Sequence, residues 1–481
     1  MSGIIAASNV DEQTVVFEAE NITKFFSILY GAGSFSFRFD NGDSDSRYTP
    51  FETQAIGYVK EFETPYTGKV IISGTLNMLS NYNVSAQNTG GKISVNLIEY
   101  EKLRNLAETG STTIEFYPYG DVIHLPRNSI KMYYLSGDIW GSLSDLPPNL
   151  KLFGVYINNT LKGNIKEIPL TVENIILQGS TTIDPIIFSD IPQNVRTLEL
   201  AVRSFSIIDS LANLRSNIIS LSIGGFANNN YITGDLSDIS NIMNFSMNTN
   251  SLITGDLSVL NRGMTTFFIN SGNEISGQIS DIPKGVTYFV CYGSNTIAGN
   301  VIDIDLPAQT FQLKGLNSIT GTIANIPKYI EYIELWGDTT LSGNITDLSR
   351  SIAQFDVRGN NTITGDLANY PKSGQSIQIG GNNTLYGDLA NCTDKLLIYL
   401  TGNMSCTYSS SDWGNMYQFI YIPTTTGLTT SEIDQLLVDL SAAEWSVYNR
   451  IDIRGANAPR TPTSDIAVAL LQSKGVTVLT N

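Results

Sequence analysis

The sequence predicts a repeat solenoid built around a parallel β-sheet, with a small all-β sandwich at its amino end and an α/β cap at its carboxyl end. Two observations lead to this prediction. A 22-residue period runs through more than half of the chain, and each period contains a short stretch of alternating apolar residues. A chain of 481 residues is also too long for one ordinary core, so either several domains or a repeat array is expected.

Glycines mark the period most clearly. From Ile253 onward, seven glycines recur every 22 residues: Gly255, Gly277, Gly299, Gly321, Gly343, Gly365 and Gly387. The same frame continues less strictly upstream, from Ile139, and suggests roughly twelve turns between residues 130 and 405. One such turn cannot bury its apolar face alone, whereas stacked neighbours bury each other's faces.

Each position of the frame has a physical role. The stretch from Ile330 to Leu335 alternates between apolar and polar residues, which is typical of a strand with one buried face. A proline follows the last buried position in several turns and breaks any helix there, namely Pro283, Pro327 and Pro371. A Gly-Asn-Asn-Thr sequence, or an equivalent, is expected to close the turn. Equivalent strands should then lie side by side as a parallel sheet with an irregular opposite side.

The segment from residue 330 to residue 345 resembles a leucine-rich repeat. It is similar to the plant-like variety LxxLxLxxNxLxGxIP, with one additional residue before the Leu-x-Gly. Some turns depart from this pattern at the proline position, where they carry Ser240, Asn261 and Ser349. The resemblance covers more than half of the chain and implies a leucine-rich-repeat solenoid over residues 139–406.

Residues 1–95 do not repeat, and their short alternating runs between turn residues predict an all-β module. The run Ser34–Asp43, followed by Tyr66–Gly74, resembles the strand and turn pattern of PKD-like β-sandwiches, with Phe39 where a tryptophan is usual. The resemblance implies a sandwich that could dock to a larger particle. Residues 96–138 are expected to hold the amino-terminal cap and the first irregular repeats.

Residues 407–481 lose the period and predict a carboxy-terminal cap. Helical spacing follows a Ser/Thr cap over Thr430–Leu440 and recurs over Ser464–Lys474, while residues 450–454 and 475–479 are typical of strands. Solenoids need such an atypical end to cover their last apolar face. The ending LLQSKGVTVLTN resembles the caps of repeat proteins found in phages of gut bacteria and in their hosts.

Composition excludes several function classes. The net charge is −17, from 45 acidic and 28 basic residues, and no basic cluster is evident, which argues against nucleic acid as a partner. No secretory signal and no run of apolar residues long enough to cross a bilayer is present, so we expect synthesis in the cytoplasm and no membrane insertion. Three cysteines, Cys291, Cys392 and Cys406, are expected to be free thiols.

No motif for a nucleophile, a metal site or a phosphate-binding loop is found, so we expect no catalytic residues, no metal and no cofactor. The one histidine, His124, is expected to be structural. A glycosidase pair of carboxylates needs no motif and stays open as an alternative. The cluster Asp40, Asp43 and Asp45 could bind calcium, but it lacks EF-hand spacing, and a solvated acidic turn is favoured.

The exposed face of the predicted sheet remains as a candidate site. Aromatic, amide and charged residues alternate there with buried ones, and aromatic rings beside charged groups suit recognition. The residues predicted to bind a ligand are Tyr288, Tyr292, Lys314, Tyr332, Glu334, Trp336, Asp356 and Arg358.

The sequence therefore favours a non-enzymatic phage virion protein, of a tail or fibre, that recognises a host surface receptor or glycan. Its amino-terminal domain would contact other virion proteins. A bacterial cell-surface adhesin and a structural virion protein with the repeat face as an assembly interface stay open, as does assembly into a homo-oligomer. The expected location is the virion, with the bacterial surface as the alternative.

Overall fold

The computed structural model of the chain forms two compact units, residues 1–233 with 247–250 and residues 234–246 with 251–481. The structure describes residues 13–30, 33–49, 55–74, 92–96, 115–125, 127, 131–134, 138–155, 160–179, 183–202, 207–224, 231–393, 397–416, 419–422, 427–445 and 450–481.

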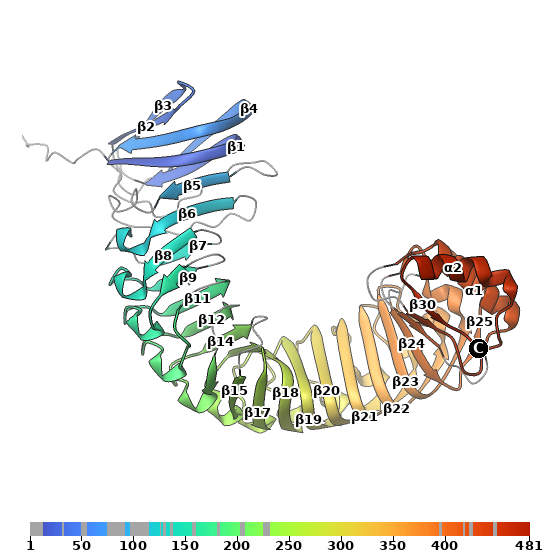
Figure 1. Cartoon of the computed structure of the whole chain (residues 1–481). Coiled ribbons are helices and arrows are strands. Elements are labelled where there is room, and N and C mark those ends of the chain that lie inside the picture. Colours follow the sequence, from blue (N-terminus) through green and yellow to red (C-terminus); the bar gives the residue numbers. More distant parts are fainter. Residues whose placement is uncertain are drawn as a thin grey trace, which may run out of the picture. The chain divides into compact units, whose positions relative to one another are not determined.

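The first unit contains an eight-stranded sheet that begins antiparallel and continues parallel. Its order is β10-β8-β6-β5-β1-β4-β2-β3, and Figure 1 labels all of these strands except β10. The strands are β1 (Gln13–Tyr30), β2 (Gly33–Phe39), β3 (Ser44–Thr49), β4 (Ala55–Gly74), β5 (Lys92–Asn96), β6 (Glu115–Asp121), β8 (Asp138–Ser142) and β10 (Thr160–Lys162). β1 pairs antiparallel with both β4 and β5, whereas β5 pairs parallel with β6. The expected domain boundary at residue 95 therefore falls inside β5, which joins the amino-terminal strands to the repeats.

The described strands of residues 1–95 all lie in this one sheet. A β-sandwich needs a second sheet packed on the first, and the sandwich stays a prediction.

A second, wholly parallel sheet in this unit collects one strand from each turn, in the order β7-β9-β11-β12-β14. These strands are β7 (Lys131–Tyr134), β9 (Leu152–Val155), β11 (Asn174–Gly179), β12 (Thr197–Val202) and β14 (Ser220–Gly224). The short strand β13 (Ile208–Ser210) also belongs to the first unit. The boundary between the two units runs through β15 (Tyr231–Asp235) and β16 (Asn244–Asn248). The repeat thus begins before residue 139, in the segment expected to be irregular.

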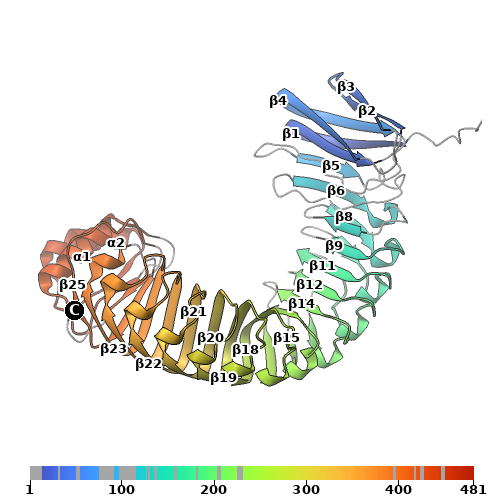
Figure 2. The same cartoon turned by 180° about the vertical axis from the view of Figure 1, so that it is seen from behind.

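The second unit contains the regular turns, each a strand followed by a short 3₁₀ helix, and from β18 to β23 each strand has 13 residues. The strands are β17 (Ser251–Asp256), β18 (Thr266–Gln278), β19 (Tyr288–Asn300), β20 (Thr310–Thr322), β21 (Tyr332–Asn344), β22 (Gln354–Asp366) and β23 (Ser376–Asp388). Neighbouring strands pair in parallel throughout, as Figures 1 and 2 show from opposite sides. The fold is therefore the repeat solenoid that the period predicts.

The strands of these turns differ from the prediction in one respect. The Gly-Asn-Asn-Thr segment does not close the turn; it bends a single 13-residue strand into two arms, and the pairing register shifts there. Gly337 occupies the bend in β21 with a φ of 128°, and a Cβ at this position would lie 2.5 Å from the backbone oxygen of Asn317. Only glycine fits this position. The second arms pair with one another, so each turn contributes to two parallel sheets instead of one.

A ladder of buried side chains supports these bends. Asparagine occupies the inner position of the bend at residues 273, 295, 317, 361 and 383, and threonine occupies it at residue 339. Asn361 accepts a hydrogen bond from the backbone N–H of Leu341 (2.9 Å) and donates one to the backbone oxygen of Gly380 (2.9 Å). A bend leaves backbone N–H and C=O groups without hydrogen-bond partners in the neighbouring strand. A side-chain amide can both donate to a carbonyl and accept from an N–H. Each asparagine therefore joins the turn before it to the turn after it.

The core between the two sheets is apolar and periodic. Four phenylalanines from consecutive turns contact one another with ring centroids 5.2–5.7 Å apart: Phe245, Phe267, Phe289 and Phe311. Cys291, Cys392 and Cys406 are buried and form no disulfide among the described residues, in agreement with the predicted thiols. Burial raises the pKa of the Cys291 thiol, as expected for a small core residue without a nearby cation.

The carboxy-terminal cap continues the parallel sheet and covers it with two helices. Its strands are β24 (Leu397–Gly402), β25 (Ser405–Thr407), β27 (Phe419–Tyr421), β29 (Arg450–Asp452) and β30 (Thr477–Leu479), with a small separate pair, β26 (Asn415–Met416) and β28 (Glu444–Trp445). The helices are α1 (Thr430–Ala442) and α2 (Asp465–Ser473), close to the predicted ranges. Among the described residues, neither helix is long and apolar enough to span a membrane.

We predict that Asn361→Ala lowers the free energy of unfolding by roughly 2–4 kcal/mol, because buried backbone groups of two turns lose their partner. Asn360→Ala is the matched control, since Asn360 is the exposed neighbour in the same bend. Chemical denaturation of the two variants measures the difference. Equal stability of both variants would show that the buried asparagines do not hold the bends in place.

Candidate recognition surface

The candidate site is the outer face of the first arms of β19–β23, defined by three rows of side chains that cross these strands. The rim row contains Tyr288, Thr310, Tyr332, Gln354 and Ser376. The middle row contains Val290, Gln312, Glu334, Asp356 and Gln378. The ladder row contains Tyr292, Lys314, Trp336 and Arg358. Because neighbouring strands lie about 4.8 Å apart, side chains of one row are close enough to touch.

All eight residues predicted to bind a ligand lie on these rows, but they are not equally accessible. Tyr288 and Tyr332 in the rim row are 38% and 41% exposed. Glu334 and Asp356 in the middle row are only 4% and 1% exposed, so the expectation that they are exposed is wrong. Both carboxylates contact side chains of the ladder row. The role of the eight residues in binding stays a prediction.

Cations and aromatic rings alternate along the ladder row. The ammonium of Lys314 lies 4.2 Å from the ring centroid of Tyr292 and 4.3 Å from that of Trp336. The guanidinium of Arg358 lies 4.0 Å from the ring of Trp336 on its other side. Cation–π contacts at these distances favour one arrangement of side chains that would otherwise be free to rotate.

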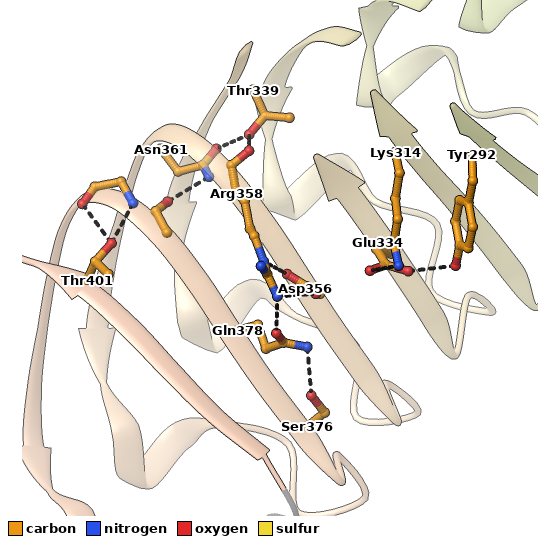
Figure 3. Close-up of polar contacts among 12 residues, drawn as sticks. Tyr292, Lys314, Glu334, Thr339, Asp356, Arg358, Asn361, Ser376, Gln378 and Thr401 are labelled. Atoms are coloured by element: carbon orange, nitrogen blue, oxygen red, sulfur yellow. Dashed lines mark hydrogen bonds and ion pairs between the residues drawn. The ribbon is translucent and has the colours of Figure 1, made fainter. Parts of the chain in front are cut away.

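The carboxylates of the middle row bind the same two cations (Figure 3). Glu334 Oε1 lies 2.9 Å from Lys314 Nζ, and Glu334 Oε2 accepts a hydrogen bond from the Tyr292 hydroxyl (2.8 Å). Asp356 accepts hydrogen bonds from Arg358 Nε (3.0 Å) and Nη2 (3.3 Å). The two ion pairs and the rings between them form one connected network, the cation–π ladder.

Burial changes the proton affinities in this network. Burial raises the pKa of Asp356 to about 6, against the opposing effect of Arg358 and with a smaller contribution from the charge of Glu334. Burial, followed by the negative charge of Glu334, raises the pKa of Tyr292. Both carboxylates are covered and bound to cations, so neither presents a free oxygen to a sugar in solvent, which a glycosidase pair requires.

The network extends beyond the residues that were predicted. Arg358 also donates to Gln378 Oε1 and lies 4.9 Å from the ring of Tyr399 in β24, which stacks on Tyr421 in β27 at 4.8 Å. Tyr399 pairs with Gln378 across the sheet, 21 residues away in the sequence. The prediction missed both tyrosines because the strict 22-residue frame ends before them.

The other two candidate sites are His124 and the acidic turn. His124 ends a 3₁₀ helix, Val122–His124, and is half-buried. In the acidic turn, Asp40 Oδ2 accepts the backbone N–H of Lys69 (2.8 Å) and Asp43 Oδ2 accepts from Asn41 (3.1 Å), whereas the side chain of Asp45 lies outside the described residues. No group of three or more His, Cys, Asp or Glu side chains within the described part of the chain could hold a metal ion. Calcium binding by this turn stays untested.

We predict that Asp356 reduces stability as the pH rises. Its pKa in the folded state, about 6, exceeds that of a free aspartate, so the folded state binds the proton more tightly and loses stability as the pH rises from about 4 to 6. The parent should lose up to ~3 kcal/mol relative to Asp356→Asn over this range. Denaturation of both proteins at several pH values measures this difference. A difference that does not change with pH would contradict the raised pKa.

Comparisons with known proteins leave the family open. No family model matches the chain, and no curated protein matches it. Among solved structures, the chain is similar to the plant peptide hormone receptor RGFR1 in complex with RGF2, with a TM-score of 0.40 and 15% identity over 80% of this chain and 88% of that one. A similarity at this level carries no functional argument, and the fold assignment depends on the repeat and the strand register.

Proposed function

We propose that the protein is a non-enzymatic recognition protein that binds a receptor or glycan of a host cell on the outer face of β19–β23. The observation that carries the proposal is the cation–π ladder with two exposed tyrosines beside it. Lys314 and Arg358 are each held between an aromatic ring and a carboxylate, so their positions are set before a ligand arrives. Side chains that are already ordered lose little entropy on binding.

The rim row supplies the groups that a ligand would touch first. Tyr288 and Tyr332 lie two strands apart, with Thr310 between them, and both are exposed. Tyrosine offers a flat apolar ring and a hydroxyl at small entropic cost, and it is common in recognition surfaces for that reason. Such a surface suits the apolar face of a sugar ring or a flat protein epitope.

The proposed setting is a phage particle, with the amino-terminal strands contacting other virion proteins. The resemblance of the carboxy-terminal cap to those of phage repeat proteins supports this setting, as does the arrangement of the amino-terminal strands at one end of the repeats. Synthesis in the host cytoplasm followed by incorporation into the particle is the route that the proposal implies.

We predict that Tyr288→Ala with Tyr332→Ala weakens binding to host cells by about tenfold or more, the effect of losing aromatic anchors from an interface. Thermal unfolding should hardly change, since both rings are exposed and their removal opens no cavity. Tyr386→Ala is the matched control, because Tyr386 is a 48% exposed tyrosine on the second arm of β23. If Tyr386→Ala lost binding and the double variant did not, the ligand would bind on the face of the second arms and the proposal would be wrong.

For the particle, we predict that mass spectrometry of purified phage detects the protein at a constant ratio to the major capsid protein across a density gradient. A membrane fraction of uninfected host cells serves as the control. Detection in that fraction, and not in particles, would contradict the virion setting and support an adhesin.

A further inference from the structure

Two exposed tyrosines of the rim row are separated by one short side chain. Tyr288 in β19 and Tyr332 in β21 flank Thr310 in β20, as the strand register shows. Both tyrosines are exposed, and Thr310 is half-buried between them. The two tyrosine positions lie two strands apart, which is ~9.6 Å at the usual strand spacing. Because threonine is much smaller than tyrosine, the rim row leaves the space above Thr310 unfilled.

Tyrosines one strand apart on the same sheet are arranged differently. Tyr399 in β24 and Tyr421 in β27 occupy paired positions of neighbouring strands. Their rings stack with centroids 4.8 Å apart and an angle of 10° between the ring planes. Each of these two rings therefore covers a face of the other. Tyr288 and Tyr332 are too far apart for such a contact, so neither ring covers the other.

The orientation of Tyr288 turns one face of its ring toward this space. Phe268 in β18 stacks on Tyr288 with ring centroids 6.2 Å apart and an angle of 29° between the planes. Because β18 and β20 lie on opposite sides of β19, the other face of Tyr288 is turned toward Thr310. Partial burial raises the pKa of Tyr288, so its hydroxyl stays a hydrogen-bond donor at neutral pH.

Three hydroxyl groups border the space above Thr310. Those of Tyr288, Thr310 and Tyr332 make no hydrogen bond among the described residues. Tyr292 in the ladder row differs, since its hydroxyl donates to Glu334 (2.8 Å). A hydroxyl can both donate and accept. The three groups therefore suit a ligand that carries several hydroxyls around its edge.

The rim row itself carries no charged side chain. The two cations of the ladder row, Lys314 and Arg358, each form an ion pair with a carboxylate of the middle row. The net charge of the chain, −17, repels an anionic ligand at long range. These features favour an uncharged ligand.

We propose that the outer face binds a neutral glycan by taking one pyranose ring between Tyr288 and Tyr332. A flat ring in contact with both would need the two tyrosine rings ~7–8 Å apart, twice the contact distance between carbon atoms. A pyranose ring is puckered and carries hydrogen atoms on both faces, so it is thicker and fills the wider separation of two strands. Its C–H faces lie on the tyrosine rings, and its hydroxyls bond to the three protein hydroxyls. This inference rests on the proposed function and names the class of ligand for the same face.

Thr310→Phe tests the insertion of a sugar ring, because a phenylalanine fills the space and leaves both tyrosines in place. Binding of the full chain to host cells should weaken by about tenfold or more. Thermal unfolding should hardly change, since aromatic residues suit exposed strand positions. Thr340→Phe is the matched control, the same substitution at an exposed position in the second arm of β21. It should bind as the parent protein does.

A flat protein epitope predicts a different result, since a third ring between the tyrosines enlarges the aromatic surface. If Thr310→Phe bound as well as the parent while Tyr288→Ala with Tyr332→Ala lost binding, the proposed function would stand and the insertion of a sugar ring would be wrong. If that double variant also bound as the parent does, the proposed function itself would be wrong. Equal losses by Thr310→Phe and Thr340→Phe would likewise overturn the insertion.

Treatment of host cell envelopes tests the class of ligand without altering the protein. Periodate cleaves the vicinal diols of sugar rings and should abolish binding of the full chain, whereas envelopes treated with quenched periodate should bind as before. Binding should also be equal at low and high salt, because a neutral ligand has no charge to screen. Binding that survives periodate would overturn the assignment to a glycan, and binding lost at high salt would overturn its neutrality.

Discussion

The regularity of this solenoid depends on the buried amide at the bend of each long strand. Stacked β-strands can slide relative to one another, and a slip of one residue would turn every core side chain outward. An asparagine such as Asn317, which accepts from Ile297 N (3.0 Å) and donates to the oxygen of Trp336 (3.2 Å), bonds to two neighbouring turns at once. The register of the first arms, and thus the alignment of rows across β19–β23, follows from these bonds. Thr339 is a local exception, and its hydroxyl bonds to the next asparagine of the ladder.

Aligned rows explain why the outer face is ordered. Residues one repeat apart lie side by side, so a lysine, a tryptophan and an arginine in successive turns alternate as cations and rings. In this arrangement Glu334 and Asp356 are buried, and burying a carboxylate costs desolvation free energy. The ion pair that each carboxylate forms with a cation offsets this cost. The raised pKa of Asp356 shows that this compensation is incomplete. The surface is thus made rigid by contacts within itself, and its rim remains available to a ligand.

Much of the fold could be predicted from the sequence, because each turn of a solenoid needs buried, turn and strand residues at the same positions of the repeat. The glycines and the two cap helices lie where the pattern places them, whereas the strand expected from Ile330 to Leu335 begins at Tyr332 and continues to Asn344. The second sheet could not be predicted in this way, since the bend and its asparagine look like a surface turn when each repeat is considered alone. The 22-residue spacing of Asn273, Asn295 and Asn317 in the sequence indicates a structural role for these asparagines. Composition alone gives no such indication. For the outer face, alternation predicted which residues share a face, but burial of Glu334 and Asp356 depends on the length and direction of neighbouring side chains, which no period encodes.

The central proposal is that the rim row beside the cation–π ladder contacts the host. Hydroxyl-radical footprinting of the protein bound to host cell envelopes tests it most directly, because it reports the solvent access of individual tyrosine rings without altering the chain. The account predicts that Tyr288 and Tyr332 become protected on binding while Tyr386 and Tyr329, which are exposed elsewhere on the same unit, react as in the free protein. Protection of Tyr386 or Tyr329 with unchanged reactivity of Tyr288 and Tyr332 would contradict it.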